Sequence, residues 1–224
     1  MWEPAGEAAG PELPTAERPV FKPLASRANV VRWLLIAIVV VSAIAAISDA
    51  FEYELLGRID RGDNVTSGEV DFNDARQAVI GITQFLLNTA VVVTFLMWFS
   101  RAYSNLPALG MAERRYGQGW SIGAWFVPIL NLFRPKQIAN DTWRAGEQVA
   151  HLPALLNWWW ALWLVSSIAD NISFRASLRG DTAMELQATA AAALVSDVLT
   201  IPAGLLAIGA VRMITRRQEE RAAA

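Results

Sequence analysis

The chain has 224 residues, 54% of them hydrophobic and 18% charged, and its formal net charge is −2 at pH 7. This composition provides for one integral membrane domain with short tails and leaves no material for a second soluble domain. Cysteine is absent and His151 is the single histidine, which excludes disulfides, thiol nucleophiles and thiolate metal sites. We therefore expect no metal and no cofactor, and the small net charge gives no reason to expect nucleic acid as a partner.

The first 29 residues are rich in proline, alanine, glycine and glutamate. Five prolines interrupt this stretch, and its apolar content is too low to bury a core. We predict a disordered cytoplasmic tail over residues 1–29.

Four apolar stretches are long enough to cross a bilayer, whose hydrocarbon core is about 30 Å thick. The expected spans are residues 30–51, 78–100, 154–174 and 188–214. A polar, acidic loop from Glu52 to Gln77 is expected between the first two. The predicted fold class is therefore an all-α integral membrane protein, with a membrane domain over residues 30–216 and a basic cytoplasmic tail over 217–224.

The stretch from 117 to 135 is apolar and aromatic, but it does not read as an ordinary span. Residues Trp120 to Phe133 would form about 21 Å of helix, which is shorter than the hydrocarbon core. Gly119 and Gly123 allow backbone turns and close packing, and Pro128 removes a helical hydrogen bond. We predict a re-entrant or interfacial Gly/Trp/Pro segment over 117–135, with a fifth crossing as the alternative.

An interfacial helix is expected next, over residues 136–150. Ile138, Thr142 and Ala145 recur at three- and four-residue spacing, while Asn140 and Arg144 lie off this stripe. Such a pattern is typical of an amphipathic helix that lies on the membrane surface.

The distribution of lysine and arginine sets the expected orientation. In the four-span arrangement, fourteen of these residues fall on the side of the two termini and five on the other side. Tryptophan gives the same answer, because nine of the ten tryptophans fall in the half nearer the termini and none in the outer half. The positive-inside rule then predicts a multi-pass protein with both termini cytoplasmic. Arginine greatly outnumbers lysine, which favours a bacterial plasma membrane in a GC-rich organism.

Each expected span carries a polar stripe at helical spacing, such as Gln84 with Asn88, or Ser166 with Asp170 and Ser173. Ionised acids are costly in lipid, so they normally face the bundle interior or water. The expected pocket, open to the outer side, is lined by Asp49, Gln84, Asn88, Asp170, Asn171 and Asp197. The alternative is hydrogen bonding between helices, with Arg76 or Arg175 pairing with an acid.

A basic, tryptophan-rich set surrounds the Gly/Trp/Pro segment. Anionic headgroups attract such residues by about 1 kcal/mol each near the surface. The residues expected to bind lipid or a partner are Arg114, Arg115, Trp120, Trp125, Arg134, Lys136 and Arg144. Ordinary positive-inside anchoring is the alternative. No Ser-His-Asp or paired-carboxylate arrangement stands out, so we predict no catalytic residue, and a membrane-embedded enzyme rests on the intramembrane acids alone.

The central residues also resemble a known family. The matching motifs are Arg101-Ala-Tyr-Ser-Asn105-Leu106, Leu109-Gly110, Arg115-Tyr116, Gly119-Trp120, Gly123-Ala-Trp125-Phe126-Val127-Pro128, Asn131-Leu132, Arg134-Pro135, Gln137 and Trp143-Arg144. This pattern, over residues 30–216, is similar to the bacterial membrane family called domain of unknown function 4328. The resemblance implies a multi-span membrane protein, often actinobacterial, with no established activity and no catalytic residues. Gln118 stands where we expect proline in relatives.

Two functions follow as hypotheses. The first is a non-enzymatic regulatory or scaffold component that binds a protein partner or anionic lipid at its cytoplasmic face. The alternative is a small-solute or ion permease that uses the outward-facing acidic pocket. Membrane lipids are expected partners in both, and a second copy of the chain is a candidate partner.

Overall fold

The computed structural model describes residues 19–111, 113–147, 151–178 and 182–224, and within these ranges the chain forms helices and no strands. Four helices are long: α1 (Ala25–Asp60), α2 (Ser67–Ser104), α5 (Ala154–Ser177) and α6 (Ala183–Ala223). Short helical elements lie between α2 and α5. They are η1 (Leu106–Leu109), α3 (Trp120–Gly123), η2 (Leu130–Leu132) and α4 (Arg134–Arg144).

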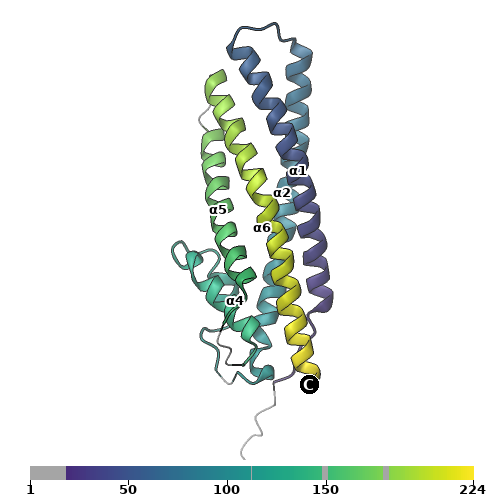
Figure 1. Ribbon diagram of the computed structural model, residues 1–224, viewed down its shortest axis with the longest axis vertical. Coiled ribbons are helices and arrows are strands. Elements are labelled where there is room, and N and C mark those ends of the chain that lie inside the picture. Colours follow the sequence, from purple (N-terminus) through teal and green to yellow (C-terminus); the bar gives the residue numbers. More distant parts are fainter. Residues whose placement is uncertain (1–18, 112, 148–150, 179–181) are drawn as a thin grey trace, which may run out of the picture.

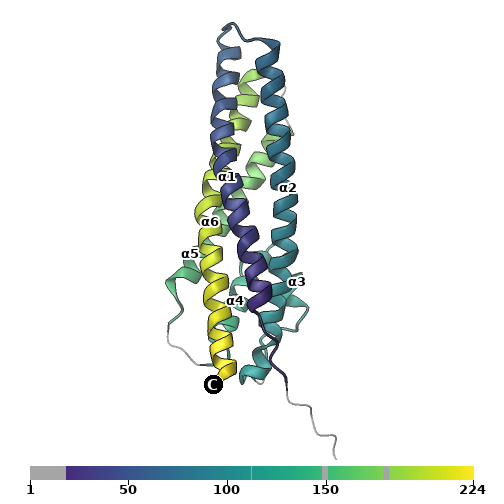
Figure 2. The same cartoon turned by 90° about the vertical axis from the view of Figure 1, so that its right-hand side faces the viewer.

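The four long helices run side by side along the molecule as two hairpins, α1 with α2 and α5 with α6 (Figure 1). The short elements gather at one end, which we call the base, where the C-terminus also lies (Figures 1 and 2). The opposite end, which we call the tip, carries the turn between α1 and α2. Extensive packing joins α1 to α6, α5 to α6 and α1 to α2.

Three of the long helices, α1, α2 and α6, are long and apolar enough to cross a membrane. They contain the predicted spans 30–51, 78–100 and 188–214. Helix α5 covers the predicted span 154–174, and its 24 residues would measure about 36 Å. It is less uniformly apolar, because asparagine, serine and aspartate interrupt its leucines and tryptophans.

The acidic stretch from Glu52 to Gln77 differs from the expected loop. Helix α1 continues to Asp60 and α2 begins at Ser67, so only the residues between them form a turn. Thr66 and Glu69 form a reciprocal capping box at the start of α2. Arg58 of α1 also lies 2.9 Å from Glu69, which ties the two helix ends together.

The predicted N-terminal tail is also shorter in the structure. Residues 1–18 lie outside the described part of the chain, but α1 already begins at Ala25 and Leu24 is fully buried. The Asn105 side chain holds the residues before this helix, since it accepts a hydrogen bond from the Lys22 N–H and donates one to the Lys22 carbonyl. Packing against the base therefore orders residues whose composition suggested disorder.

Residues 117–135 do not form a helix that could cross a membrane. The segment consists of the single turn α3, a bend through Pro128 and the short η2. Ile129 has a φ of 68°, which ends any continuing helix. The next helix, α4, stops at Arg144, because Ala145 and Gly146 both have positive φ. It is thus shorter than the predicted 136–150, of which residues 148–150 lie outside the described residues.

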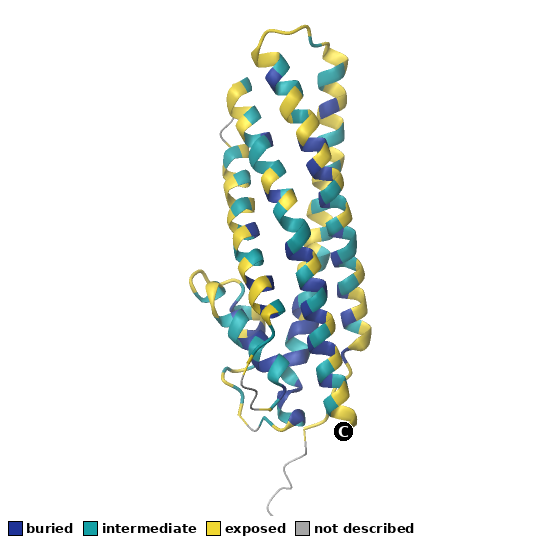
Figure 3. Ribbon diagram, in the orientation of Figure 1, coloured by how far each residue is buried: buried dark blue, intermediate teal, exposed yellow. Residues whose placement is uncertain are grey.

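The core is concentrated at the base (Figure 3). The buried Trp98 indole donates to Thr215 Oγ1 at 3.0 Å, which joins α2 to α6. Gln218 is fully buried and donates to the carbonyls of Ala102 and Thr142. The predicted basic tail 217–224 is therefore largely a continuation of α6 that helps to build the core.

Candidate functional site

Helices α2 and α5 do not pack extensively on each other. A cavity of about 860 Å³ lies between them, with α1 and α6 completing its wall. We call it the α2–α5 cavity. Its lining includes Gln84 and Asn88 of α2, Asp170 of α5 and Asp197 of α6, four of the six residues that the sequence predicts for a pocket.

The polar residues of this cavity are joined by hydrogen bonds between helices. Gln84 Nε2 donates to Asp197 Oδ1 at 2.6 Å, which links α2 to α6. The Ser196 hydroxyl donates to the Asp170 carboxylate, which links α6 to α5. Asp170 nevertheless stays exposed and Asp197 half-buried, so both carboxylates remain accessible from the cavity. Asp197 also contacts Ser42 and the Asp49 carboxylate, so the acceptor capacity that remains for a bound group lies mainly on Asp170.

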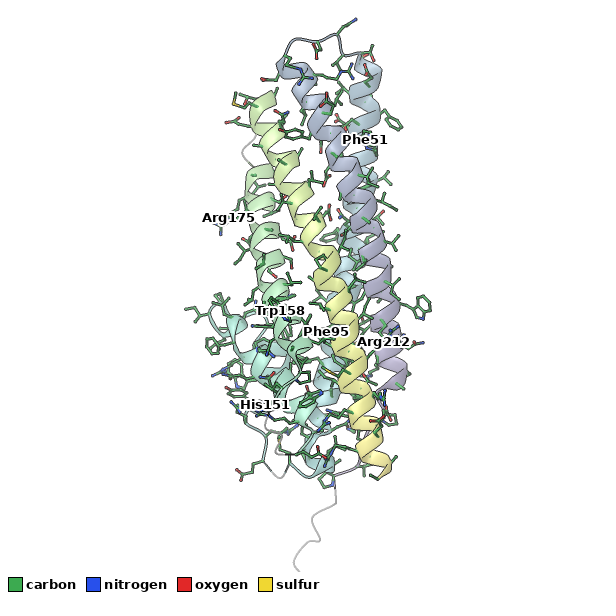
Figure 4. The ribbon with its side chains drawn as sticks, viewed as in Figure 1. Phe51, Phe95, His151, Trp158, Arg175 and Arg212 are labelled. Carbon is green, nitrogen blue, oxygen red and sulfur yellow. The ribbon has the colours of Figure 1, made fainter. Side chains whose placement is uncertain are left out.

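Aromatic side chains close the end of the cavity nearest the base. Trp125 packs edge-on against Phe95 of α2 and Trp163 of α5, with ring centroids 5.4 and 5.3 Å away. Phe95 also lies 6.2 Å from Trp159 of α5, so aromatic rings bridge the two helices here. In Figure 4, Phe95 lies within the bundle above the base. Trp125, predicted to contact lipid or a partner, is thus half-buried in the floor of this cavity.

Two predicted pocket residues do not line this cavity. Asp49 of α1 is buried beside the Asp197 carboxylate and accepts a hydrogen bond of 3.2 Å from Gln77. Asn171 lines a smaller cavity of about 380 Å³ together with Arg175. Figure 4 shows Arg175 projecting away from the bundle. Asn171 follows Asp170 directly in the helix, and the turn of about 100° between neighbours sends it to this other face.

A polar network nearer the tip was not anticipated from the sequence. Arg76 Nε donates to Ser48 Oγ at 2.8 Å, and its terminal nitrogen donates to Asn73 Oδ1 at 2.6 Å. Gln77 donates to Glu52 at 2.5 Å in addition to Asp49. Arg76 was expected to pair with an acid, but its guanidinium instead donates hydrogen bonds to neutral oxygens of Ser48 and Asn73. This network fastens α1 to α2 above the cavity.

The basic residues predicted to bind lipid make contacts within the protein. The guanidinium of Arg134 lies over the Trp120 ring at 4.2 Å and the Tyr116 ring at 5.0 Å. Arg114 lies 5.6 Å from the Tyr103 ring and donates to the Gln118 side chain. The contact of Arg114 with Tyr103 joins the loop around α3 to α2, whereas Arg134 stacks on rings of the loop itself.

Asp141 gathers two further members of the basic set. Arg115 lies 3.4 Å and Arg144 4.0 Å from its carboxylate, which is buried. Burial raises the pKa of Asp141, and the two positive charges oppose that rise. Sequence reasoning missed this acid, because only the fold brings Arg115 beside it.

Lys136 is the last member of the basic set. Burial lowers the pKa of Lys136 to about 8, and its ammonium donates to Asn140 at 2.8 Å. Within the residues that the structure describes, no three histidine, aspartate or glutamate side chains gather as a metal site.

Comparison with known proteins gives one finding. A family model described as "Domain of unknown function (DUF4328)" matches residues 61–216. No curated protein and no solved structure matches the chain.

Proposed function

We propose that this chain, which belongs to the DUF4328 family, a domain of unknown function, is a non-enzymatic membrane protein. It binds a small amphipathic cation in the α2–α5 cavity. The observation that carries this proposal is the meeting of Asp170 and Asp197, from different helices, on one cavity with an aromatic floor. Solute binding therefore takes precedence over the scaffold hypothesis.

The chemistry of the lining favours a cation with an apolar body. Two carboxylates and the amides of Gln84 and Asn88 supply negative charge and acceptors at one level. Trp125, Trp159 and Trp163 supply apolar surface and π faces nearer the base. Acids within membrane spans point by default to an ion or substrate pathway. A cavity of this size suits a drug-sized ligand.

The proposed topology has four spans, with α5 as the third and both termini in the cytoplasm of a bacterial plasma membrane. The length of α5 and the excess of basic residues at the base support it. In this topology the segment 117–135 lies at the cytoplasmic interface without crossing. The exposure of Phe126, Ile129 and Leu132 supports that placement, because an apolar loop is stable against lipid.

Single cysteines test the topology, since the chain has none of its own. Glu113 and His151 are exposed and flank the segment, so Glu113→Cys and His151→Cys leave the core intact. An impermeant thiol reagent should label both from the cytoplasmic side only. Labelling from opposite sides would mean a fifth crossing and would overturn the four-span arrangement.

Binding is tested with tetraphenylphosphonium as the probe and the full-length protein in nanodiscs. We expect saturable binding that Asp170→Asn and Asp197→Asn each weaken at least about tenfold, because an opposed charge is lost. Asp74→Asn, at an exposed position near the tip, serves as the matched control and should bind like the native protein. Equal affinity in the cavity variants would contradict the proposal.

A permease would not only bind this cation but also carry it across the membrane. The aromatic floor around Trp125 closes the cavity toward the base, so transport would require that floor to open. Uptake of the same cation into proteoliposomes, abolished by Asp170→Asn, would support a permease. Binding without uptake would support a receptor or a regulatory component.

The scaffold function is the second candidate, and the exposed apolar loop from Phe126 to Phe133 favours it. A photo-reactive amino acid placed at Phe126 in living cells tests this function. A reproducible protein adduct would support a scaffold with a dedicated partner. Adducts to lipid alone would assign the loop to the membrane interface and count against the scaffold.

A further inference from the structure

A second cavity, of about 1140 Å³, lies at the base between the start of α1 and the end of α6. Four arginines line it, Arg32 from α1 with Arg212, Arg216 and Arg217 from α6, and we call it the arginine cleft. Glu220 is the one acidic residue in its lining. None of these residues belongs to the α2–α5 cavity or to the basic set predicted around α3 and α4.

Two of the four arginines already have anionic partners. Arg217 lies 2.5 Å from Glu147 and stacks over the Trp143 ring at 4.3 Å. Arg216 lies 2.6 Å from Glu220. The positive charges of these two residues are thus compensated locally.

Arg32 and Arg212 differ from them. In the described part of the chain, neither guanidinium makes a hydrogen bond or an ion pair. The Nε of Arg32 is buried and has no hydrogen-bond partner, whereas Arg212 is exposed. A buried donor without an acceptor is costly, so a bound acceptor would stabilise Arg32. The surplus of positive charge favours an anion as that acceptor.

The position of the two arginines identifies the anion. Arg32 lies at the start of the apolar part of α1, and Arg212 lies near the end of the apolar part of α6, so both occupy the same membrane boundary. Trp33, beside Arg32, is 65% exposed, as is typical of an indole at the headgroup level. Figure 4 shows Arg212 toward the base, where α6 runs beside α1. Lipid phosphate is the abundant anion at this level.

We propose that the arginine cleft binds the phosphate of an anionic phospholipid, with Arg32 and Arg212 as its direct ligands. Guanidinium groups match phosphate through paired N–H donors, which an ammonium does not provide. The uncompensated positive charges of Arg32 and Arg212 favour acidic headgroups over zwitterionic ones. This site is independent of the cation proposed for the α2–α5 cavity.

The test is retention of phosphatidylglycerol by the full-length protein, measured by native mass spectrometry after exchange from mixed micelles. The native protein should keep phosphatidylglycerol in preference to phosphatidylcholine. Arg32→Gln with Arg212→Gln should lower that retention at least about tenfold. Arg175→Gln is the matched control, because it removes an exposed arginine from α5 outside the cleft. It should retain lipid like the native protein.

Lysine variants keep the test decisive if the double glutamine variant does not fold. Arg32→Lys with Arg212→Lys preserves charge and removes the paired donors, so retention should fall to an intermediate level. Equal retention of the two lipids by the native protein would overturn the proposal, as would a loss with Arg175→Gln as large as that in the cleft variants. Displacement of the lipid by millimolar glycerol phosphate would also overturn it, because the site would then take a soluble anion.

Discussion

The carboxylate of Glu219 accepts a hydrogen bond of 2.6 Å from the backbone N–H of Leu24, although the two residues lie near opposite ends of the sequence. The same oxygen accepts from the N–H of Ala25, the first residue of α1. The first helix has no side-chain cap of its own, so the last helix supplies one. This contact closes the base of the bundle.

Replacing Glu219 with alanine should therefore destabilise the protein. Loss of a helix cap costs about 1 kcal/mol, and the negative charge near a helix N-terminus is lost as well. Unfolding by sodium dodecyl sulfate in mixed micelles measures the change. Glu219→Gln keeps an acceptor oxygen and should cost less than Glu219→Ala. Equal stability of all three proteins would show that the cap contributes nothing.

Gln218 should be more sensitive, because it is fully buried and bridges two carbonyls from α2 and α4. Methionine has a similar volume but leaves both carbonyls without a donor. We expect Gln218→Met to lower the free energy of unfolding by about 1–3 kcal/mol. The neighbouring exposed Glu220 provides the control, and Glu220→Gln should be neutral in the same titration.

Gly146 should not tolerate a side chain. Its φ is 87°, and a Cβ atom there would lie 2.5 Å from the carbonyl oxygen of Leu109. Gly146→Ala should lower stability by about 1–3 kcal/mol through backbone strain and displacement of the η1 turn. A Cβ at Gly68 would meet nothing within 4 Å, so Gly68→Ala should cost nothing. Equal melting temperatures for the two variants would contradict the strain predicted for a side chain at Gly146.

The protein should become more stable as the pH rises through the range in which Lys136 loses its proton. Burial lowers the pKa of Lys136 from its ordinary 10.5 to about 8, so between these values the unfolded chain binds more protons than the folded protein. The free energy of unfolding attributable to Lys136 therefore increases from about pH 8 to about pH 10.5. Melting temperatures measured across this range should show the rise in the native protein and not in Lys136→Met. Lys136→Arg stays charged and should be destabilised throughout.

Ile129 carries strain that glycine would relieve. Positive φ is unusual for a β-branched residue, and the side chain of Ile129 is 72% exposed, so it contributes little packing. Ile129→Gly should raise stability by about 1 kcal/mol in detergent. The same change removes apolar surface from the loop, so it should weaken photo-labelling of this loop by a lipid-phase probe. Leu132→Gly, without positive φ, should weaken labelling without the gain in stability.

The sequence predicted the all-helical fold and three helices long and apolar enough to cross a membrane, because apolar runs of that length permit little else. It also predicted which face of α5 meets the cavity, since Ser166, Asp170 and Ser173 recur at helical spacing and all line it. Asn171 was misplaced because composition ignores rotation about the helix axis. The acidic stretch was read as a loop because the ion pair of Arg58 with Glu69 depends on the hairpin itself.

The basic residues were harder to interpret, because charge alone does not reveal a partner. Arg134 stacks on Trp120, and Arg115 meets the buried Asp141, and both contacts require the folded loop around α3. The two unpartnered arginines of the cleft, Arg32 and Arg212, carried no motif to distinguish them. Only the packing of α1 against α6 brings these two arginines into one cleft.

The hairpin at the tip offers a practical handle for imaging. Helix α1 has 36 residues and would measure about 54 Å, against about 30 Å of hydrocarbon, so its polar end stands clear of the apolar zone. A small protein of 24.6 kDa in a micelle presents few landmarks for particle alignment. A rigid helical fusion spliced in place of the turn at 61–66 would extend both helices without entering the lipid. It would mark the direction of the bundle axis in every particle.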